Sequence, residues 1–288
     1  MEAIKEHKLL ILIVLFNMRL DECKTYNSLS EYLHLLNLPY EIILYNNSPQ
    51  IQISQSGNEI ENCIIINAKQ NEKLVGPYNY AWKYAIEKQF DWIMLLDQDT
   101  LLSEDYLMKI GELIPNVEGN IAAITPKVYS HKFQISPVIL NKYTGAFGQQ
   151  KEWCGTNDKI GNDSYLTAIN SGSVLSVQAI SHINGFCEDF PLDFLDYWYF
   201  YEFYCMGYSV LPINASLIHE LSSIASYNSM GEKRYVEYLK ARGIYAKKTN
   251  LSIWITFKLR TLGQCITQLF SSSERKFFKY TFKALLIN

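Results

Sequence analysis

The chain has 288 residues, of which 48% are hydrophobic and 19% charged, a composition typical of a globular protein with a large buried core. Its formal net charge is only −3, and its six cysteines are scattered without a Cys-x-x-Cys pair. Since we identify no signal peptide, we expect reduced thiols and a cytosolic location. The apolar run from Leu9 to Phe16 is too short to span a bilayer, and we predict a buried strand there.

The first half of the chain alternates apolar runs with amphipathic stretches, which is typical of βαβ units on a mostly parallel sheet flanked by helices. Residues 140–170 are polar and rich in glycine without a clear period, and the pattern from residue 232 onward is helical throughout. We predict strands at 9–15, 41–45, 63–66, 92–96, 121–124, 174–177 and 210–213, the last closing with Ile218 and His219. We predict helices at 21–36, at 78–89, after Ser103, at 179–184 and from Leu195 to Gly207.

Charge is distributed unevenly along the chain. Residues 232–288 carry 12 Lys and Arg against 3 Asp and Glu, whereas residues 1–231 carry 14 against 26. An acidic body with a basic C-terminal region predicts contact with an anionic partner. Residues 276–286 interleave lysines with bulky apolar side chains, which is typical of an amphipathic helix on a membrane surface. Packing of this helix against the acidic body is the alternative, and no nucleic-acid reader motif accompanies the charge.

The most informative stretch is the triplet Asp97-Gln98-Asp99, which follows five consecutive apolar residues. Strand ends in open α/β sheets are where ligands bind. Two carboxylates one residue apart at such an edge are hard oxygen ligands that suit Mg²⁺ or Mn²⁺. The alternative is a solvated acidic turn that leads into a helix capped by Ser103.

Other polar side chains also follow predicted strands. Asn17 follows the first strand, residues 46–48 follow the second and His219 ends the last, while Asn79 lies near the start of a helix. Because the carboxyl ends of parallel strands share one edge of a sheet, we expect these groups to converge. For His219 the alternative is a buried histidine whose ring nitrogens serve only the core.

The order and spacing of these groups over residues 8–225 resemble the family-2 inverting glycosyltransferases of the GT-A fold, most closely their bacterial rhamnosyltransferase-like branch. The resemblance implies a GT-A catalytic domain at 1–225, with a nucleotide-sugar half at about 1–100 and an acceptor half at about 101–225. A basic amphipathic helical region would follow at 226–288. The segments that carry the resemblance are Phe16-Asn17, Tyr45-Asn46-Asn47-Ser48, Gly76-Pro77-Tyr78-Asn79, Leu96-Asp97-Gln98-Asp99, Ile124-Thr125-Pro126-Lys127-Val128, Asn170-Ser171-Gly172-Ser173, Gly185-Phe186-Cys187-Glu188-Asp189 and Asp193-Phe194-Leu195-Asp196-Tyr197-Trp198.

The resemblance also implies roles for single residues. Asp99 is the first candidate for a direct ligand of Mn²⁺ or Mg²⁺, with Asp97 nearer the ribose or acting through water, and His219 as a further ligand. Asp196 matches the carboxylate that serves as general base. The other implied contacts are nucleotide-sugar binding by Asn17, Asn46, Ser48, Asn79, Asp97 and Gln98, and acceptor binding by Asp193, Tyr197 and Trp198.

Three positions depart from the family pattern. Asn46 stands where an Asp usually holds the nucleobase, Trp198 where an acidic residue is common, and Glu202 where Arg is common. For Asp193 and Asp196 a simpler interpretation also stands, because carboxylates are favourable near the N-terminus of any helix.

The resemblance implies a metal-dependent inverting glycosyltransferase, and its rhamnosyltransferase-like branch implies transfer of L-rhamnose from dTDP-rhamnose to a glycan acceptor in bacterial cell-surface polysaccharide synthesis. We expect a lipid-linked acceptor and a protein that is peripheral at the cytoplasmic face of the cell membrane. The alternatives are a UDP-sugar donor carrying galactofuranose, a hexose or an N-acetylhexosamine, and an inactive module that binds glycan or membrane. Nucleotidyl transfer is disfavoured because Asn17-Met18-Arg19-Leu20 offers no glycine to cradle a triphosphate.

Overall fold

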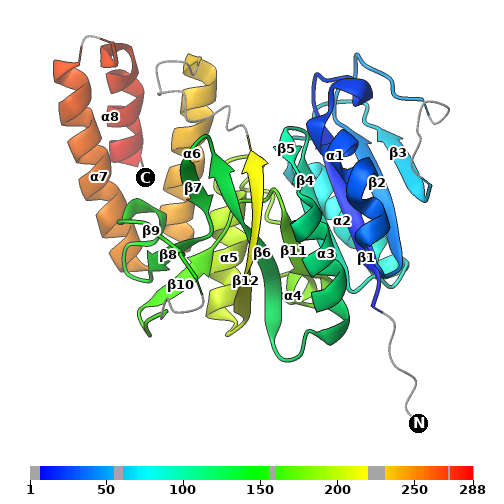
Figure 1. Ribbon diagram of the computed structural model, residues 1–288. Helices are drawn as coiled ribbons and strands as arrows, with labels where there is room; N and C mark the ends of the chain where they lie inside the picture. The colour runs from blue at the N-terminus through cyan, green and yellow to red at the C-terminus, as the bar shows by residue number, and fades with distance from the viewer. Residues whose placement is uncertain (1–6, 55–60, 156–159, 220–230, 272, 288) are drawn as a thin grey trace.

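A computed structural model of the protein describes residues 7–54, 61–155, 160–219, 231–271 and 273–287. Its centre is a large mixed sheet (Figure 1). The strands of this sheet, in spatial order, are β3 (Cys63–Asn67), β2 (Tyr40–Asn46), β1 (Leu9–Leu15), β4 (Trp92–Asp97), β11 (Ser173–Ser176), β6 (Ile121–Ser130), β12 (Ser209–His219) and β5 (Thr100–Leu101), with β7 (Phe133–Ser136) paired to β6.

The first four strands in this order run parallel, as the alternation of strands and helices predicted. β11 then runs antiparallel to both of its neighbours, and β6 and β12 are again parallel to each other. The register pairs Leu15 with Asn46 and Val14 with Asp97. The ends of β1, β2 and β4 therefore lie side by side at one edge of the sheet.

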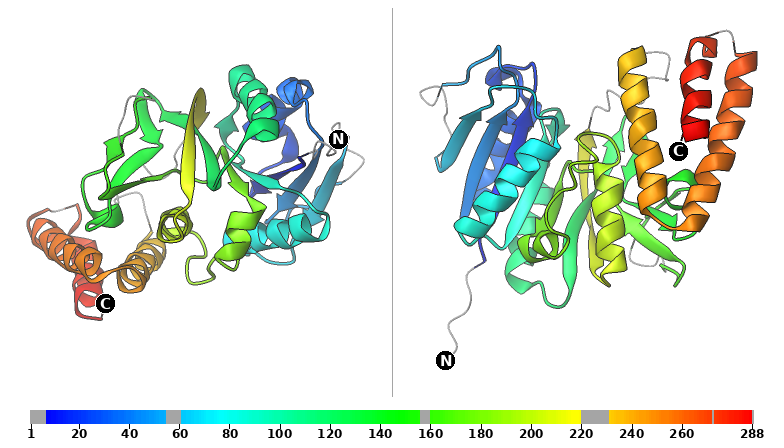
Figure 2. Two further views of the ribbon diagram at one scale, coloured as in Figure 1. Left: turned by 90° about the horizontal axis from the view of Figure 1, so that it is seen from below. Right: turned by 180° about the vertical axis from the view of Figure 1, so that it is seen from behind.

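Two layers of helices cover the two faces of the sheet because successive strand residues point to opposite sides. In β1, Leu10, Leu12 and Val14 belong to one buried cluster, whereas the odd-numbered residues from 9 to 15 belong to the other. The first cluster includes α2 (Val75–Glu87), α4 (Val177–His182) and α5 (Leu195–Cys205), which lie together in the right-hand view of Figure 2. The second includes α1 (Lys24–Tyr32) and α3 (Glu104–Leu113), which face the viewer in Figure 1.

Most predicted elements are present, with two notable differences. The stretch 140–170 contributes to a second, small sheet of β10 (Ser164–Thr167), β8 (Val138–Asn141) and β9 (Lys151–Glu152), whose strands are too short to show a period. β6 continues through Pro126 to Ser130, and β12 runs from Ser209 to His219, which includes the predicted 210–213 run and its predicted close at Ile218 and His219. Pro126 is tolerated because the β6–β12 pairing is irregular between Pro212 and Ser216, so no regular ladder bond is lost there.

Three C-terminal helices confirm the helical pattern after residue 232: α6 (Glu232–Lys248), α7 (Leu251–Phe270) and α8 (Phe278–Ile287). They stand beside the small sheet, on the far side from β1–β3 (Figures 1 and 2). Their inner side chains, including Tyr245 and Phe257, join the same buried cluster as α5. No helix in the described ranges is both long and apolar enough to cross a membrane. The boundary predicted at 225/226 falls outside the described residues.

Gly172, the residue before β11, is closely packed against neighbouring side chains near the ends of the strands. Its φ is +84°, and a Cβ there would lie 2.4 Å from Leu217 Cδ1 and 3.0 Å from Pro126 Cγ. We predict that Gly172→Ala lowers the free energy of unfolding by about 1–3 kcal/mol beyond the cost of positive φ alone. Gly119→Ala is the matched control, because its φ is +82° and nothing lies within 4 Å of its Cβ position. Equal losses for the two variants in urea unfolding would contradict this packing account.

Candidate active site

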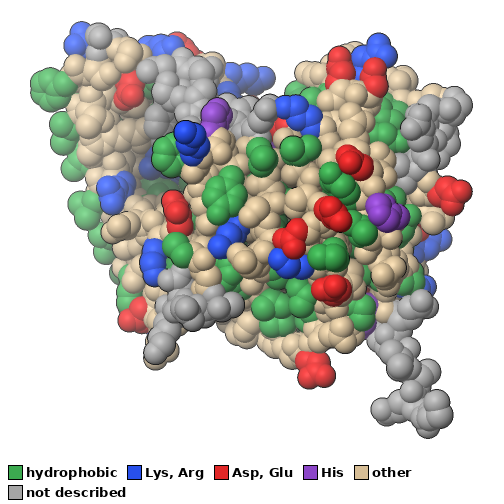
Figure 3. Space-filling view, viewed as in Figure 1, with side chains coloured by type: hydrophobic (Ala, Val, Ile, Leu, Met, Phe, Trp, Pro, Cys, Tyr) green, Lys and Arg blue, Asp and Glu red, His purple; other side chains and the backbone are tan. Residues whose placement is uncertain are grey.

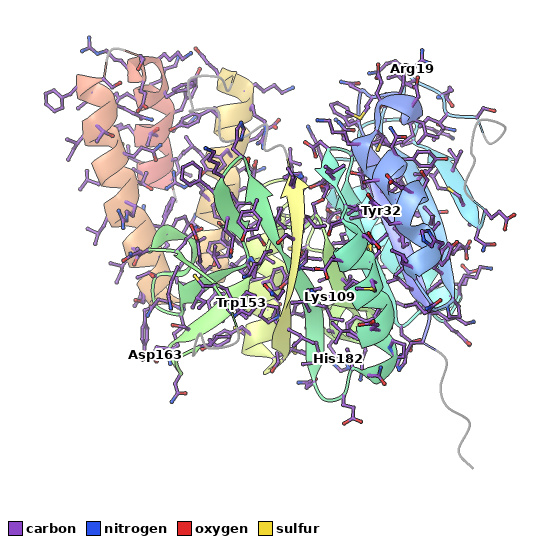
Figure 4. The ribbon with its side chains drawn as sticks, in the orientation of Figure 1. Arg19, Tyr32, Lys109, Trp153, Asp163 and His182 are labelled. Carbon is purple, nitrogen blue, oxygen red and sulfur yellow. The ribbon has the colours of Figure 1, made fainter. Side chains whose placement is uncertain are left out.

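The site residues predicted at the ends of β1, β2 and β4 lie at the upper edge of the sheet, where the parallel strands end. Figure 4 marks this edge by Arg19, shortly after β1, and the opposite end of the molecule by His182. The surface in Figure 3 is notched at this edge, between the part that contains β1–β3 and the part that contains α6–α8. The candidate site is therefore an open recess beside the strand ends.

Side chains from other elements hold the backbone of the acidic triplet. The Thr25 hydroxyl of α1 contacts the carbonyl of Asp97 and lies 2.9 Å from that of Thr100, whose N–H it accepts at 2.9 Å. Ser171 Oγ accepts the N–H of Asp97 at 3.0 Å. Because these backbone groups are satisfied within the fold, the turn presents its two carboxylates without needing them for its own hydrogen bonds.

His219 lies against this turn. Its Nδ1 is 3.3 Å from Asp99 Oδ1 and 2.9 Å from Thr100 Oγ1, which in turn contacts Ser171 Oγ. The imidazole is buried, and β12 places it there by pairing His219 with Thr100. The structure thus brings His219 to Asp97 and Asp99, although it follows them by more than 100 positions in the chain.

Asp196 is placed in the same region by α5. Burial raises the pKa of Asp196 to about 7, with further upward contributions from Asp193 and Asp97 and a downward one from the N–H of Tyr197, 2.8 Å from Asp196 Oδ1. Burial also raises the pKa of Asp97, Asp99 raises it further, and His219 opposes both effects. Two carboxyl groups from distant elements therefore share one poorly solvated space and disfavour each other's charge.

Tyr78 was quoted in a motif but given no role, and it lies between these carboxyl groups. Its pKa is raised well above the ordinary value by burial and by the charges of Asp97, Tyr199 and Asp196. Its hydroxyl is fully buried and has no hydrogen-bond partner among the described residues. The neighbouring Tyr199 hydroxyl, by contrast, donates to Asn170 Oδ1 at 3.1 Å. A buried hydroxyl without a partner is costly, so Tyr78 is an unsatisfied donor close to the two carboxyl groups.

The nucleotide-side candidates form a connected rim. The N–H of Asn17 donates to Ser48 Oγ at 2.7 Å, and the N–H of Phe16 donates to Gln98 Oε1 at 2.7 Å. Asn17 is exposed, in the left-handed conformation with φ of +51°, whereas Ser48 is buried. The ends of β1, β2 and β4 are thus joined by side chains as well as by strand pairing.

The Asn46 side chain makes its hydrogen bonds to other residues of the fold. Its Nδ2 donates to Asn67 Oδ1 at 2.7 Å and to the carbonyl of Ile51, and its Oδ1 accepts the N–H of Ser48 at 3.1 Å. The residue is fully buried. The two donated bonds explain why an amide is suitable at this position, because an ionised carboxylate cannot donate.

Asn79 is not brought to the strand ends as a free side chain. Its Nδ2 donates to the carbonyl of Phe186 at 2.8 Å, and its Oδ1 accepts the N–H of the same residue at 2.9 Å. Gly185 passes so close that a Cβ there would lie 2.4 Å from the Trp82 ring and 2.9 Å from Asn79 Oδ1. Asn79 therefore fastens α2 to the segment before α5.

The acceptor-side candidates divide between two surroundings. Asp193 forms a two-pronged ion pair with Arg234 of α6, and the Tyr197 hydroxyl accepts from Gln150 Nε2 at 3.0 Å. Trp198 instead stacks on Phe190 and lines a separate groove of about 560 Å³ between α2 and α5. That groove has neither Asp97 nor Asp196 in its lining, so Trp198 faces away from the carboxyl pair.

The family resemblance covers residues 8–225 and therefore predicted no role for Arg234. Its guanidinium binds the carboxylate two residues before Leu195, where α5 begins, and Phe194 between them has a φ of +63°. A left-handed conformation is strained for phenylalanine. The ion pair and the packing of Phe194 on Tyr245 hold this turn, and the turn sets where Asp196 lies.

Comparison with known proteins supports the same architecture. No protein-family model matches the chain. The chain is 22% identical over 194 residues to dTDP-rhamnosyl transferase RfbF of Shigella flexneri, covering 67% of this chain and 60% of that relative. This chain therefore spans less than two thirds of the length of this curated relative.

Solved structures resemble it more extensively. A mannosyltransferase from Pyrobaculum calidifontis with GDP-Man and Mn²⁺ matches 96% of this chain and 84% of its own, with a TM-score of 0.51 and 8% identity. GalNAc-T7 with UDP, GalNAc and Mn²⁺ gives a TM-score of 0.56 at 9% identity, over 88% of this chain and 54% of its own. Residues 1–349 of S. aureus TarS with UDP give 0.52 at 12% identity, over 87% and 69%.

The chain has the GT-A fold. Within that fold, the expected acidic triplet lies at the end of β4 and the expected base candidate at the start of α5. Among the described residues, no group of three or more His, Cys, Asp and Glu side chains is placed to hold a metal ion by itself. A cation in this GT-A recess would need further ligands from a bound molecule or from water.

The departure at Asn46 from the GT-A family pattern is directly testable. We predict that Asn46→Asp lowers the free energy of unfolding by about 1–3 kcal/mol at pH 8, because the carboxylate meets two acceptor oxygens in a buried place. The loss should shrink below about pH 4, where a protonated Asp regains one donor. Urea unfolding at both pH values measures this effect, with Asn17→Asp as an exposed control. Unchanged stability at pH 8 would show that the amide donors of Asn46 are dispensable.

Proposed function

We propose that this protein is a metal-dependent inverting glycosyltransferase. The observation that carries the proposal is the meeting of Asp97 and Asp99 at the end of β4 with Asp196 at the start of α5, in a chain with the GT-A fold. The triplet suits the diphosphate side of a nucleotide-sugar, and the second carboxyl group suits the acceptor side. Holding the diphosphate and activating the acceptor require two acidic groups within reach of the same sugar.

For the donor we propose dTDP-L-rhamnose. The relative from Shigella flexneri is named a dTDP-rhamnosyl transferase, which supports this choice. The solved neighbours were crystallised with UDP or GDP-Man, so a UDP-sugar is the alternative within the same fold. Asn17, Ser48 and Gln98 form the rim nearest the proposed nucleotide, whereas Asn46 and Asn79 would act through the backbone they fasten.

A divalent cation fits the chemistry of the donor set. Asp97 and Asp99 supply hard oxygen ligands. The pKa of Asp97 is raised by burial and, further, by the nearby charge of Asp99. We propose that Asp99 and Asp97 hold Mn²⁺ or Mg²⁺, with His219 supporting Asp99 through its Nδ1 contact or acting as a ligand itself. Such an ion, when bound, neutralises the charge that develops on the departing diphosphate.

Asp196 is the proposed general base. Its carboxylate accepts the proton of the acceptor hydroxyl while that oxygen bonds to the anomeric carbon, and the bond from this carbon to the diphosphate breaks on the opposite face. A pKa of about 7 suits this task because the group is both ionised and basic near neutral pH. The Tyr78 hydroxyl lies where it can donate a hydrogen bond to a bound group between the two carboxyls.

The acceptor is proposed to be a lipid-linked glycan of a bacterial cell-surface polysaccharide, reached at the inner face of the cell membrane. Tyr197 is the acceptor-side candidate nearest Asp196, and it is held by Gln150 and by the Tyr245 ring. Asp193 acts through the turn it forms with Arg234, and Trp198 would meet only an extended acceptor that reaches the groove beside α2.

The base assignment predicts a specific loss. Asp196→Asn should reduce sugar transfer by at least about a hundredfold while leaving nucleotide affinity within about threefold, because the amide cannot accept the proton. In the unaltered protein, kcat/KM should rise with pH and level off above about pH 7, where Asp196 is ionised. Radiolabelled sugar transfer and nucleotide binding give the two readouts.

Asp163→Asn is the matched control, since Asp163 is a half-exposed carboxylate paired with Lys142 and lies at the end of the molecule opposite Arg19 (Figure 4). Near-normal turnover by Asp196→Asn would remove Asp196 from the mechanism. A parallel loss of nucleotide binding would instead assign Asp196 to the integrity of the fold.

A further inference from the structure

Helix α7 exposes a continuous apolar surface. We define the α7 ridge as seven side chains that are each between 44% and 83% exposed: Leu251, Ile255, Leu259, Leu262, Ile266, Leu269 and Phe270. The opposite side of the same helix, including Ile253, Phe257 and Cys265, is buried. α7 is therefore apolar on both sides, and only its inner side is used by the protein's own core.

The ridge is one stripe rather than a scatter of single residues. Its members follow one another at intervals of four, four, three, four, three and one, which keeps them on one side of an α-helix. Figure 3 shows them as a column of hydrophobic side chains along the left edge, over α7. Singly exposed apolar residues need no explanation, but a contiguous apolar surface of this length marks a contact site.

The charges on α7, α8 and the segment between them are mostly positive. α7 and α8 contain no Asp or Glu, and Glu274 is the one acidic residue between positions 251 and 288. Over the same stretch the chain carries Lys258, Arg260, Arg275, Lys276, Lys279 and Lys283. Lys279 Nζ is 3.9 Å from Glu232 Oε2 of α6, and the cations still outnumber the acids around this stripe. An apolar stripe with a cationic surplus beside it complements a surface that is apolar inside and negatively charged at its boundary.

We propose that the α7 ridge docks the protein on a bilayer surface that contains anionic lipid. A helix of 20 residues is about 30 Å long and would lie in the plane of the interface, with its ridge among the acyl chains and its cations at the headgroups. A second copy of the chain suits the surface less well. α7 carries Lys258 and Arg260 but no acidic side chain, so two ridges placed together would form no charge pairs between the two α7 helices.

This assignment differs from the sequence expectation, which placed the membrane contact in residues 276–286. In the structure Phe277, Thr281 and Ala284 are buried, and Phe277 packs its ring against Tyr235 of α6. The Tyr235 hydroxyl also bonds Thr281 Oγ1 at 2.7 Å. α8 thus packs on α6 and α7 with one side, while Phe282 and Leu286 stay exposed on the other.

Vesicle co-sedimentation of the full chain tests the proposal. Vesicles of phosphatidylcholine with phosphatidylglycerol in equal parts should bind the protein, and pure phosphatidylcholine should bind it at least about tenfold more weakly. The double variant Leu259→Gln/Ile266→Gln should lose at least about tenfold in affinity for the mixed vesicles. Phe133→Gln is the control, because Phe133 is 72% exposed on β7, outside α7, and should bind as the unaltered protein does.

Two further measurements separate this docking from the proposed catalytic function. Nucleotide binding and the thermal unfolding temperature of the ridge variant should stay unchanged, since its substitutions are exposed and lie outside the recess. Unaltered vesicle binding by the ridge variant would overturn the proposal, as would failure of the unaltered protein to bind either vesicle. A dimer in solution that the ridge variant converts to monomer would overturn it in favour of a second copy.

Discussion

Burial of Asp97 and Asp196 at one edge of the sheet is the constraint on which the rest of the site depends. Both groups have raised pKa values chiefly because neither is well solvated; Asp99 raises the pKa of Asp97 further, and Asp193 and Asp97 raise that of Asp196. The fold bears this cost through rigid surroundings: Thr25 and Ser171 hold the backbone of the triplet, and the N–H of Tyr197 supports Asp196. A cluster of negative charge that the protein leaves uncompensated is a natural place for a cation and for a proton transfer.

Another carboxylate of the region, that of Asp193, is treated differently, and this difference ties the C-terminal helices to the site. Asp193 is neutralised by Arg234 of α6, so its charge is not left to oppose ionisation of Asp196 in full. The same ion pair holds the left-handed turn at Phe194, which rings from α5 and α6 enclose. The helices after residue 231 are therefore part of what positions the base candidate. A surface on α7 that binds a membrane would be carried by the same packed unit.

How much the sequence could reveal depended on whether a signal was local. The continuous apolar run of β1 and the acidic end of β4 follow from residue order alone, and both predictions of element type are confirmed. The small sheet of β8–β10 was missed because its strands are too short to show a period. Arg234 and Tyr78 were missed because their significance lies in contacts with residues far away in the chain. Asn46 looked like a departure from a binding motif, yet its donated bonds to Asn67 and Ile51 give it a structural reason that only the folded chain displays.

Calorimetric titration with dTDP, UDP and GDP, each with and without Mn²⁺, tests the central claim that this recess binds a nucleotide-sugar through a cation at the triplet. The account predicts metal-dependent binding of dTDP in about the micromolar range, weakened at least about tenfold by Asp99→Ala. Preference for UDP would keep the claim and change the donor. Absence of binding for all three nucleotides under every metal condition would contradict it, and would leave the chain as a GT-A module that binds glycan or membrane without catalysis.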